Sequence, residues 1–307
     1  MGKIDESNTT STKHLINLQD LSPNEHLYSQ SKGLLMVFNQ VNFHDGRKYK
    51  PRTGANLDLN KIRDTFSHFS FKVEVRVDLT VKEIFSVLHH LPLQHNLQEF
   101  SSLMVIFLTY GEGNDKIMAS DHSFSLKDIA NALQPDKIEE LTGKPKIIMI
   151  NASRGNKLNK SVSFNASGGT SDETPTDSKI STSVAYNLEN YALYDKDIGC
   201  GYSGFYPLNA DFLFCYSTYD NHLSFRNEYG SWFIQEFCDV LDSNKESSIE
   251  IMDVLTTTCR RMAKRRTDSI GELDNIKQVP MFTSTLTRKF LFLPKSLINY
   301  LKSKSTK

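Results

Sequence analysis

The sequence lacks the features that would assign a chain at once to a membrane, a secretory route or nucleic acid. No apolar run approaches the roughly 20 residues that a membrane-spanning helix needs. Residues 1–20 contain no apolar core of the kind that a secretory signal requires. Lys and Arg number 36, as do Asp and Glu, so no excess of one charge attracts nucleic acid or an acidic membrane. We therefore expect a cytoplasmic protein with no nucleic-acid partner and no membrane partner.

Cysteine is scarce as well. The four cysteines, Cys200, Cys215, Cys238 and Cys259, are widely spaced and form no Cys-x-x-Cys pair from which a zinc site is commonly built. Three of them lie in apolar periodic segments, which is typical of buried, reduced thiols. The sequence therefore predicts no metal site and no cofactor.

What the sequence does contain is an alternation of apolar strands and amphipathic helices. Most of the strands are apolar throughout, which favours an α/β fold with a mostly parallel sheet and helices on both faces. We expect strands over residues 33–39, 71–78, 101–109, 146–151, 211–218, 279–286 and 288–294. We expect helices over residues 54–69, 80–91, 125–133, 229–241 and 248–266.

Composition divides the chain into five parts. Residues 1–31 are polar and rich in Ser, Asn and Thr, which predicts a short disordered tail. Residues 156–205 interrupt the alternation with a polar, Gly/Ser/Thr-rich stretch, which predicts a flexible linker. The linker separates a larger unit, 32–155, from a smaller one, 206–295, and a second tail, 296–307, follows.

Two side chains stand where a sheet of this kind places its site, beyond the carboxyl ends of the strands. Tyr110 follows the strand predicted over 101–109, and Ser153 follows the strand predicted over 146–151. Ser153 also completes the glycosylation sequon Asn-Ala-Ser, but without a secretory route we expect no glycan there. Both residues are therefore candidates for a functional site.

Six motifs, taken in their order and spacing, resemble one known family. They are "PRTGANLDLNKI" (51–62), "LTGKPKIIMI" (141–150), "NASRG" (151–155), "NADFLFCYST" (209–218), "SFRNEYGSWFIQEFC" (224–238) and "KQVPMFTSTLTRKFLF" (277–292). Together they resemble the caspases (peptidase C14), cysteine proteases that cut after aspartate. The resemblance runs from Gly33 to Pro294. It implies a caspase-like (caspase–hemoglobinase) fold, with a mostly parallel six-stranded sheet flanked by helices. The large-subunit-like part is then 32–155, the small-subunit-like part is 206–295, and the short first segment resembles insect effector-type members.

The same resemblance implies that the catalytic pair has been replaced. Ser153 stands where the family has its cysteine nucleophile, and Tyr110 stands where it has its histidine. A thiol has a pKa near ~8.5 and is partly ionised at neutral pH, whereas a serine hydroxyl needs an adjacent base. Tyrosine, with a pKa near ~10, stays protonated and does not serve as that base. We therefore expect a pseudoenzyme, or decoy caspase. The alternative is a serine peptidase with an unconventional base, for which His122 and His222 are the candidates.

The resemblance also implies binding groups that survive these changes. The backbone N–H groups of Gly111 and Ser153 would form an oxyanion hole. Arg52, Asn151 and Arg226 would form a pocket for aspartate, in which Asn151 is shorter than the family's glutamine. The residues expected to line adjoining subsites are Ser224, Phe225 and Trp232. Two interpretations remain open: a groove that still binds aspartate peptides weakly, or arginines that only anchor loops.

Residues 279–285 are apolar or hydroxylated and carry no charge. In the family this strand pairs with its counterpart across a two-fold axis, and an exposed apolar edge strand needs such pairing. The resemblance therefore implies a dimer strand composed of Val279, Pro280, Met281, Phe282, Thr283, Ser284 and Thr285. Its partner would be an active caspase paralogue or a second copy of this chain.

Two further features bear on regulation. The linker contains Asp177 and Asp197, at which an active caspase would cut, although an uncut loop is the competing interpretation. The basic cluster 260–266 is interpreted as a solvated helix end rather than a nucleic-acid site. The function that we expect is regulation of an active effector caspase and of apoptosis by heterodimerisation, with activation slightly favoured over inhibition. The alternatives are the serine peptidase and a homodimeric module that binds aspartate peptides.

Overall fold

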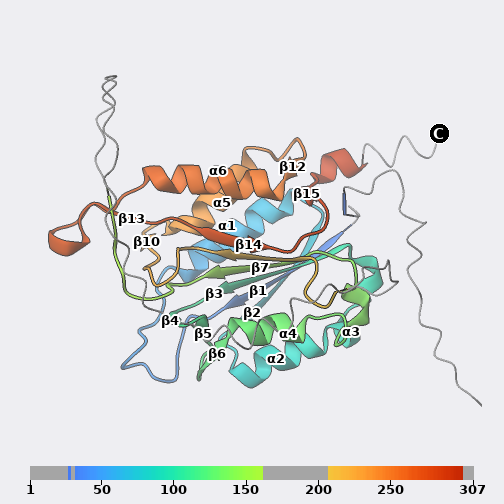
Figure 1. Cartoon of the computed structure of the whole chain (residues 1–307), viewed down its shortest axis with the longest axis horizontal. Coiled ribbons are helices and arrows are strands. Elements are labelled where there is room, and N and C mark those ends of the chain that lie inside the picture. Colours follow the sequence, from blue (N-terminus) through green and yellow to red (C-terminus); the bar gives the residue numbers. More distant parts are fainter. Residues whose placement is uncertain (1–26, 29–31, 162–206, 300–307) are drawn as a thin grey trace, which may run out of the picture. The chain divides into compact units, whose positions relative to one another are not determined.

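A sheet of six strands organises the protein, in the order β14-β9-β7-β3-β1-β2. The computed structural model describes residues 27–28, 32–161 and 207–299 (Figure 1). Neighbouring strands run parallel except β9 and β14, which are antiparallel. The strands are β1 Gly33–Asn39, β2 Phe71–Val77, β3 Ser102–Leu108, β7 Lys146–Asn151, β9 Phe212–Tyr216 and β14 Met281–Ser284. The prediction of a mostly parallel six-stranded sheet is confirmed.

The three central strands are buried on both faces. Every residue of β1, β3 and β7 is buried, as expected when helices cover a parallel sheet on both sides. The register places Val37 beside Ile106 and Ile106 beside Met149. The unbroken apolar runs in the sequence thus follow from packing between two layers of helices.

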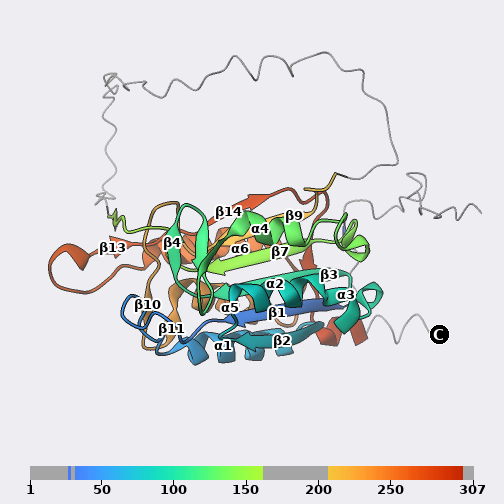
Figure 2. The ribbon, with the colours of Figure 1, turned by 90° about the horizontal axis from the view of Figure 1, so that it is seen from below.

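Helices form those two layers (Figures 1 and 2). One face is covered by α1 Ala55–Ser67, α5 Trp232–Asp242 and α6 Ile251–Lys264. The other is covered by α2 Val81–His89, α3 Leu91–Gln94 and α4 Leu126–Ala132. Each face encloses its own hydrophobic cluster. The predicted start of α2 is confirmed, because the Thr80 side chain accepts a hydrogen bond from the Glu83 backbone N–H and completes a capping box.

Short elements complete the described part of the chain. A three-stranded sheet consists of β4 Gly111–Gly113, β5 Lys116–Met118 and β6 Ser123–Ser125. The paired strands are β8 Asn159–Lys160 with β13 Ile276–Lys277, β10 Arg226–Asn227 with β11 Gly230–Ser231, and β12 Ile249–Glu250 with β15 Leu291–Phe292. Short 3-10 turns are η2 Leu97–Glu99, η3 Glu139–Leu141 and η5 Gly271–Leu273. Apart from β15, which lies within the strand predicted over 288–294, these elements were not predicted from the sequence, because two or three residues carry no periodicity.

The last two predicted strands are shorter than expected. The strand predicted over 279–286 begins only at Met281, after Pro280, because proline has no N–H to donate to a neighbouring strand. The strand predicted over 288–294 is reduced to β15, and β15 pairs with β12 outside the six-stranded sheet. Phe292 in β15 is fully buried against the aromatic rings of Phe66 and Phe69, so packing fixes this segment rather than the sheet.

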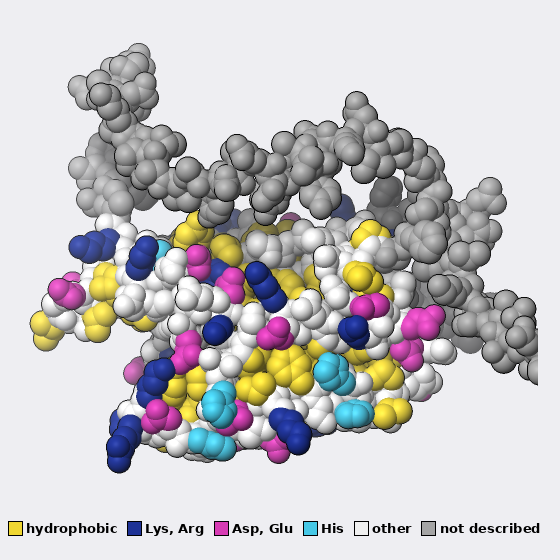
Figure 3. All heavy atoms as spheres, turned by 60° about the horizontal axis from the view of Figure 1, so that its bottom comes forward, with side chains coloured by type: hydrophobic (Ala, Val, Ile, Leu, Met, Phe, Trp, Pro, Cys, Tyr) yellow, Lys and Arg dark blue, Asp and Glu magenta, His cyan; other side chains and the backbone are white. Residues whose placement is uncertain are grey.

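Several predictions fall outside the described residues. They concern most of the first tail, most of the linker with Asp177, Asp197 and Cys200, and the last part of the second tail. Among the described residues, no helix is long and apolar enough to cross a membrane. On the face that carries α2 and α4, basic, acidic and histidine side chains are mixed rather than gathered by sign (Figure 3).

Candidate functional site

Tyr110 and Ser153 lie close together because their strands are neighbours. The end of β3 pairs with the end of β7, with Leu108 opposite Asn151. Gly111, which opens β4, lies directly against the Ser153 backbone: a Cβ placed on Gly111 would be 1.7 Å from the Ser153 carbonyl oxygen. Only glycine fits at this position. The two backbones expected to form an oxyanion hole are therefore in contact.

A cavity of about 80 Å³ opens at this edge of the sheet. The predicted site residues that line it are Arg52, Tyr110, Asn151, Ser153, Ser224, Phe225 and Arg226. Thr109, Ala152 and Ser231 line it as well. The chain thus brings together four regions that are far apart in sequence: the segment before α1, the end of β3, the end of β7, and the segment that leads into α5.

Ser153 Oγ lies in the cavity and acts there as a hydrogen-bond acceptor. The Ser224 backbone N–H donates to Ser153 Oγ over 3.1 Å. Of the two candidate bases, His122 has an 83% exposed side chain and lies 3.2 Å from Asp121. His222 Nδ1 lies 2.6 Å from the Asp220 carbonyl oxygen. In the part of the chain that the structure describes, neither histidine lines the cavity.

Tyr110 is turned toward the loop that precedes α1. Its hydroxyl donates to the Lys50 carbonyl oxygen over 3.2 Å. Its ring centroid lies 5.2 Å from that of Phe43 and 5.6 Å from that of Tyr49, a spacing typical of packed aromatic side chains. Packing therefore holds the ring of Tyr110, and its hydroxyl is engaged away from Ser153.

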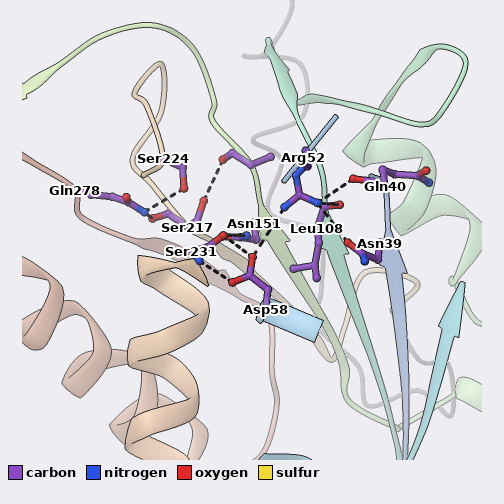
Figure 4. A network of polar contacts seen from close by, with 11 residues as sticks. Asn39, Gln40, Arg52, Asp58, Leu108, Asn151, Ser217, Ser224, Ser231 and Gln278 are labelled. Atoms are coloured by element: carbon purple, nitrogen blue, oxygen red, sulfur yellow. Dashed lines mark hydrogen bonds and ion pairs between the residues drawn. The ribbon is translucent and has the colours of Figure 1, made fainter. Parts of the chain in front are cut away.

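Arg52 is a buried cation at the floor of the cavity. It is 3% exposed, and its Nη1 donates to the carbonyl oxygens of Gln40 and Leu108 over 2.9 and 2.8 Å (Figure 4). Its Nη2 lies 4.0 Å from the Asp58 carboxylate. Burial, and then the nearby charge of Arg226, lower the pKa of Arg52 to about 10, so it remains charged at neutral pH.

A chain of hydrogen bonds lies beside this arginine (Figure 4). The Ser231 backbone N–H and Oγ each donate to the Asp58 carboxylate over 2.6 Å. Because Ser231 Oγ gives its only proton to Asp58, it accepts from Asn151 Nδ2, over 2.9 Å. One amide N–H of Asn151 is therefore engaged inside the protein. Burial raises the pKa of the Asp58 carboxyl.

Gln278 holds two residues that line the cavity, Ser224 and Phe225. It is fully buried, and its Oε1 accepts the Phe225 backbone N–H over 2.6 Å. Its Nε2 donates to the Ser217 carbonyl oxygen over 2.6 Å and to Ser224 Oγ over 3.2 Å. Sequence reasoning missed Gln278, Asp58 and Ser231. The signal for Asp58 was a carboxylate on the apolar face of its helix, one turn before Ile62.

Trp232 contacts Phe225 but does not line the same cavity as the other predicted subsite residues. It lines a second cavity of about 350 Å³ together with Tyr229, Gln235 and Arg265. Its ring centroid is 5.3 Å from that of Phe225, which lines the first cavity. The Arg265 guanidinium lies 5.8 Å from the centre of the Trp232 ring. Phe225 thus lines the first cavity, and Trp232 lines the second.

The expected dimer strand lies at one edge of the sheet. β14 pairs with β9 on one side, and within the described residues no strand pairs with its other side. Met281 and Phe282 are half-buried, whereas Thr283 and Ser284 are exposed. Val279 and Pro280 precede the strand, and Thr285 follows it with its Oγ1 donating to the Asn209 carbonyl oxygen. The described residues contain no group of three or more His, Cys, Asp or Glu side chains that could hold a metal ion.

Both the sequence and the structure are similar to those of known proteins. A family model for the caspase domain (Peptidase_C14) matches residues 32–291. Caspase-6 from Gallus gallus is 30% identical over 271 residues, which cover 87% of this chain and 82% of that protein. Caspase-3 from Bos taurus is 30% identical over 265 residues, which cover 85% of this chain and 84% of that protein. The crystal structure of caspase-1 from Spodoptera frugiperda matches with a TM-score of 0.70 and 26% identity, covering 88% of this chain and 94% of that one.

Proposed function

Because the chain belongs to the caspase family, we propose that it is a catalytically inactive member that regulates an active effector caspase, and with it apoptosis, by heterodimerisation. The observation that carries the proposal is the chemistry around Ser153. Among the described residues no histidine lines the cavity with it, and the hydroxyl of the neighbouring Tyr110 donates to the Lys50 carbonyl oxygen. A serine nucleophile needs a base that accepts its proton, and a protonated phenol does not do so at neutral pH.

The edge of β14 supports the proposed mode of action. Edge strands offer unpaired N–H and C=O groups, and half-buried apolar residues beside them favour pairing with another chain. Met281 and Phe282 are half-buried apolar residues of this strand, and Thr283 and Ser284 are exposed. A partner that pairs with this edge in its active conformation would be stabilised in that conformation. We therefore favour activation over sequestration.

The first experiment separates catalysis from regulation. The purified protein is incubated alone with a fluorogenic peptide that ends in aspartate, beside the Ser153→Ala variant. We expect no turnover from either protein. Turnover that Ser153→Ala abolishes would contradict the proposal and would identify a serine peptidase.

Heterodimerisation is tested by sedimentation velocity with an active caspase whose own cysteine is blocked. Thr283→Lys places a charge on the exposed side of β14 and should prevent pairing, because charge at an edge strand opposes it. Ser86→Lys, on the exposed surface of α2, is the matched control. The proposal requires a complex with the wild type and with Ser86→Lys, and none with Thr283→Lys.

A second candidate function rests on the arginines. Arg52 is a buried cation whose nearest carboxylate, Asp58, is 4.0 Å away, and Arg226 shares its cavity. Paired guanidinium groups bind carboxylates well. This arrangement favours a groove that retains weak affinity for peptides ending in aspartate. Fluorescence anisotropy with labelled tetrapeptides tests it: tighter binding of the Asp peptide than of its Asn analogue supports the idea, and equal binding assigns the arginines to loop anchoring.

A further inference from the structure

A ladder of hydrogen bonds joins the segment after β7 to the segment before β10. The Leu223 backbone N–H donates to the Lys157 carbonyl oxygen over 3.1 Å, and the Arg154 backbone N–H donates to the His222 carbonyl oxygen over 2.9 Å. The next contact toward the cavity joins a backbone group to a side chain rather than to another backbone group. There, the Ser224 backbone N–H donates to the side chain of Ser153.

This last contact lies at the cavity itself. Ser153, Ser224 and Phe225 all line the cavity, and Ser224 is the first residue of the wall that continues to Arg226. The neighbouring amide, that of Phe225, is held differently, by the buried Gln278 side chain over 2.6 Å. The adjacent backbone N–H groups of Ser224 and Phe225 are thus held by two different side chains. Ser153, which follows β7, holds the first, and Gln278, which precedes β14, holds the second.

We propose that Ser153 is a positioning residue, whose hydroxyl oxygen holds the Ser224 amide and keeps the wall Ser224–Arg226 in place against the end of β7. The residue that replaces the family's nucleophile thereby has a structural task in the groove. The consequence for peptide affinity rests on the peptide binding proposed above, whereas the hydrogen bond itself does not.

Serine suits this task for a physical reason. A hydroxyl oxygen is a good acceptor at 3.1 Å, whereas a sulfur is larger and accepts hydrogen bonds only weakly. Alanine offers no acceptor, so a partly buried N–H would lose its partner. We therefore expect serine at position 153 to hold the Ser224 N–H most strongly, cysteine less strongly and alanine least. Ser153→Thr keeps the hydroxyl oxygen and should hold it as serine does.

Hydrogen exchange resolved to single amides tests the proposal on the protein alone. In Ser153→Ala we expect the Ser224 amide to exchange roughly 3- to 10-fold faster, which is the effect of losing one net hydrogen bond. The Phe225 amide should keep its wild-type rate because Gln278 still holds it, and it serves as the internal control. Ser153→Thr should restore the protection of Ser224.

Two results would contradict the proposed role of the Ser153–Ser224 hydrogen bond. One is wild-type protection of Ser224 in Ser153→Ala, and the other is equal acceleration of Ser224 and Phe225, which indicates general loosening. The anisotropy measurement then adds the functional consequence: a roughly 3- to 10-fold weaker Asp-peptide affinity in Ser153→Ala, restored in Ser153→Thr. Peptide binding that is absent in the wild type would contradict the groove function without touching the exchange result.

Discussion

The Asp58 carboxylate accepts two hydrogen bonds of 2.6 Å from Ser231, one from its backbone N–H and one from its Oγ. The pair joins α1 to the start of α5 beneath the cavity, across 173 positions of sequence. Both side chains are buried, so the bonds are protected from water. The floor of the candidate site thus depends on a contact between the two halves of the fold.

The Asp58–Ser231 pair predicts a measurable coupling. Ser231→Ala removes two hydrogen bonds of the side chain, the one to Asp58 and the one from Asn151, and should lower the free energy of unfolding by about 1–3 kcal/mol. Asp58→Ala also leaves the Ser231 N–H and Arg52 without their carboxylate, and should cost about 3–5 kcal/mol. In the double variant, the loss should be smaller than the sum by about 1 kcal/mol or more. Chemical denaturation of the four proteins measures this cycle, and strict additivity would contradict the pairing.

Gly230 should tolerate no side chain, because two separate constraints act on it. Its φ is +121°, and a Cβ there would lie 2.5 Å from Asp58 Oδ1. Gly230→Ala should therefore lower the free energy of unfolding by about 2–4 kcal/mol. Gly271→Ala is the matched control, since Gly271 has a φ of +75° but open space around it, and should cost only about 1 kcal/mol. Equal losses in thermal or urea unfolding would show that the Asp58 contact is not limiting.

Lys146 predicts a pH dependence of stability. It is fully buried at the start of β7, where its Nζ donates to the Lys144 carbonyl oxygen over 2.9 Å. Burial lowers its pKa from 10.5 to about 8. Above pH 8 the folded state loses this proton while the unfolded chain keeps it up to about pH 10.5, so stability rises with pH in that window.

The size of this effect follows from the shift, at about 1.4 kcal/mol for each pKa unit. The difference in free energy of unfolding between the wild type and Lys146→Met should grow in favour of the wild type by about 2–3 kcal/mol from pH 8 to pH 10. Urea titrations at both pH values measure it. A difference that stays constant would mean that Lys146 keeps an ordinary pKa in the folded state.

Long helices and strands could be predicted from the sequence alone, whereas short elements could not. The six strands of the sheet and the five long helices were predicted, because buried apolar runs and helical periodicity extend over many residues. The hairpins β4–β6 and β10–β11 were missed, because two or three residues leave no period. The positions of Tyr110 and Ser153 followed from strand ends that meet at one edge of a parallel sheet.

The supporting contacts lay beyond sequence reasoning. Gln278 reaches Phe225 across 53 positions, and Asp58 reaches Ser231 across 173. Such pairings depend on the three-dimensional path of the chain and leave no local pattern. The position of Trp232 has the same origin: its ring contacts Phe225 but lines a second cavity.

Arg226 should control the affinity for aspartate peptides. It lines the cavity beside the buried Arg52. Arg226→Gln should weaken binding of the Asp-terminated tetrapeptide about 10- to 100-fold, the range expected for losing a charge-assisted pair, and should abolish the preference over the Asn analogue. Arg63→Gln, an equal change of charge on the exposed surface of α1, should leave both affinities as they are. A similar loss in both variants would point to long-range charge rather than to the pocket.

The central claim, an inactive chain that regulates an active caspase, is tested most directly by titration. The purified protein is added to a fixed, sub-saturating amount of a closely related active caspase while turnover of an Asp-reporting fluorogenic peptide is followed. We predict no turnover from the protein alone and a saturable rise in turnover on addition, absent with Thr283→Lys. Unchanged turnover at saturating amounts, or turnover from the protein alone that Ser153→Ala abolishes, would contradict the claim.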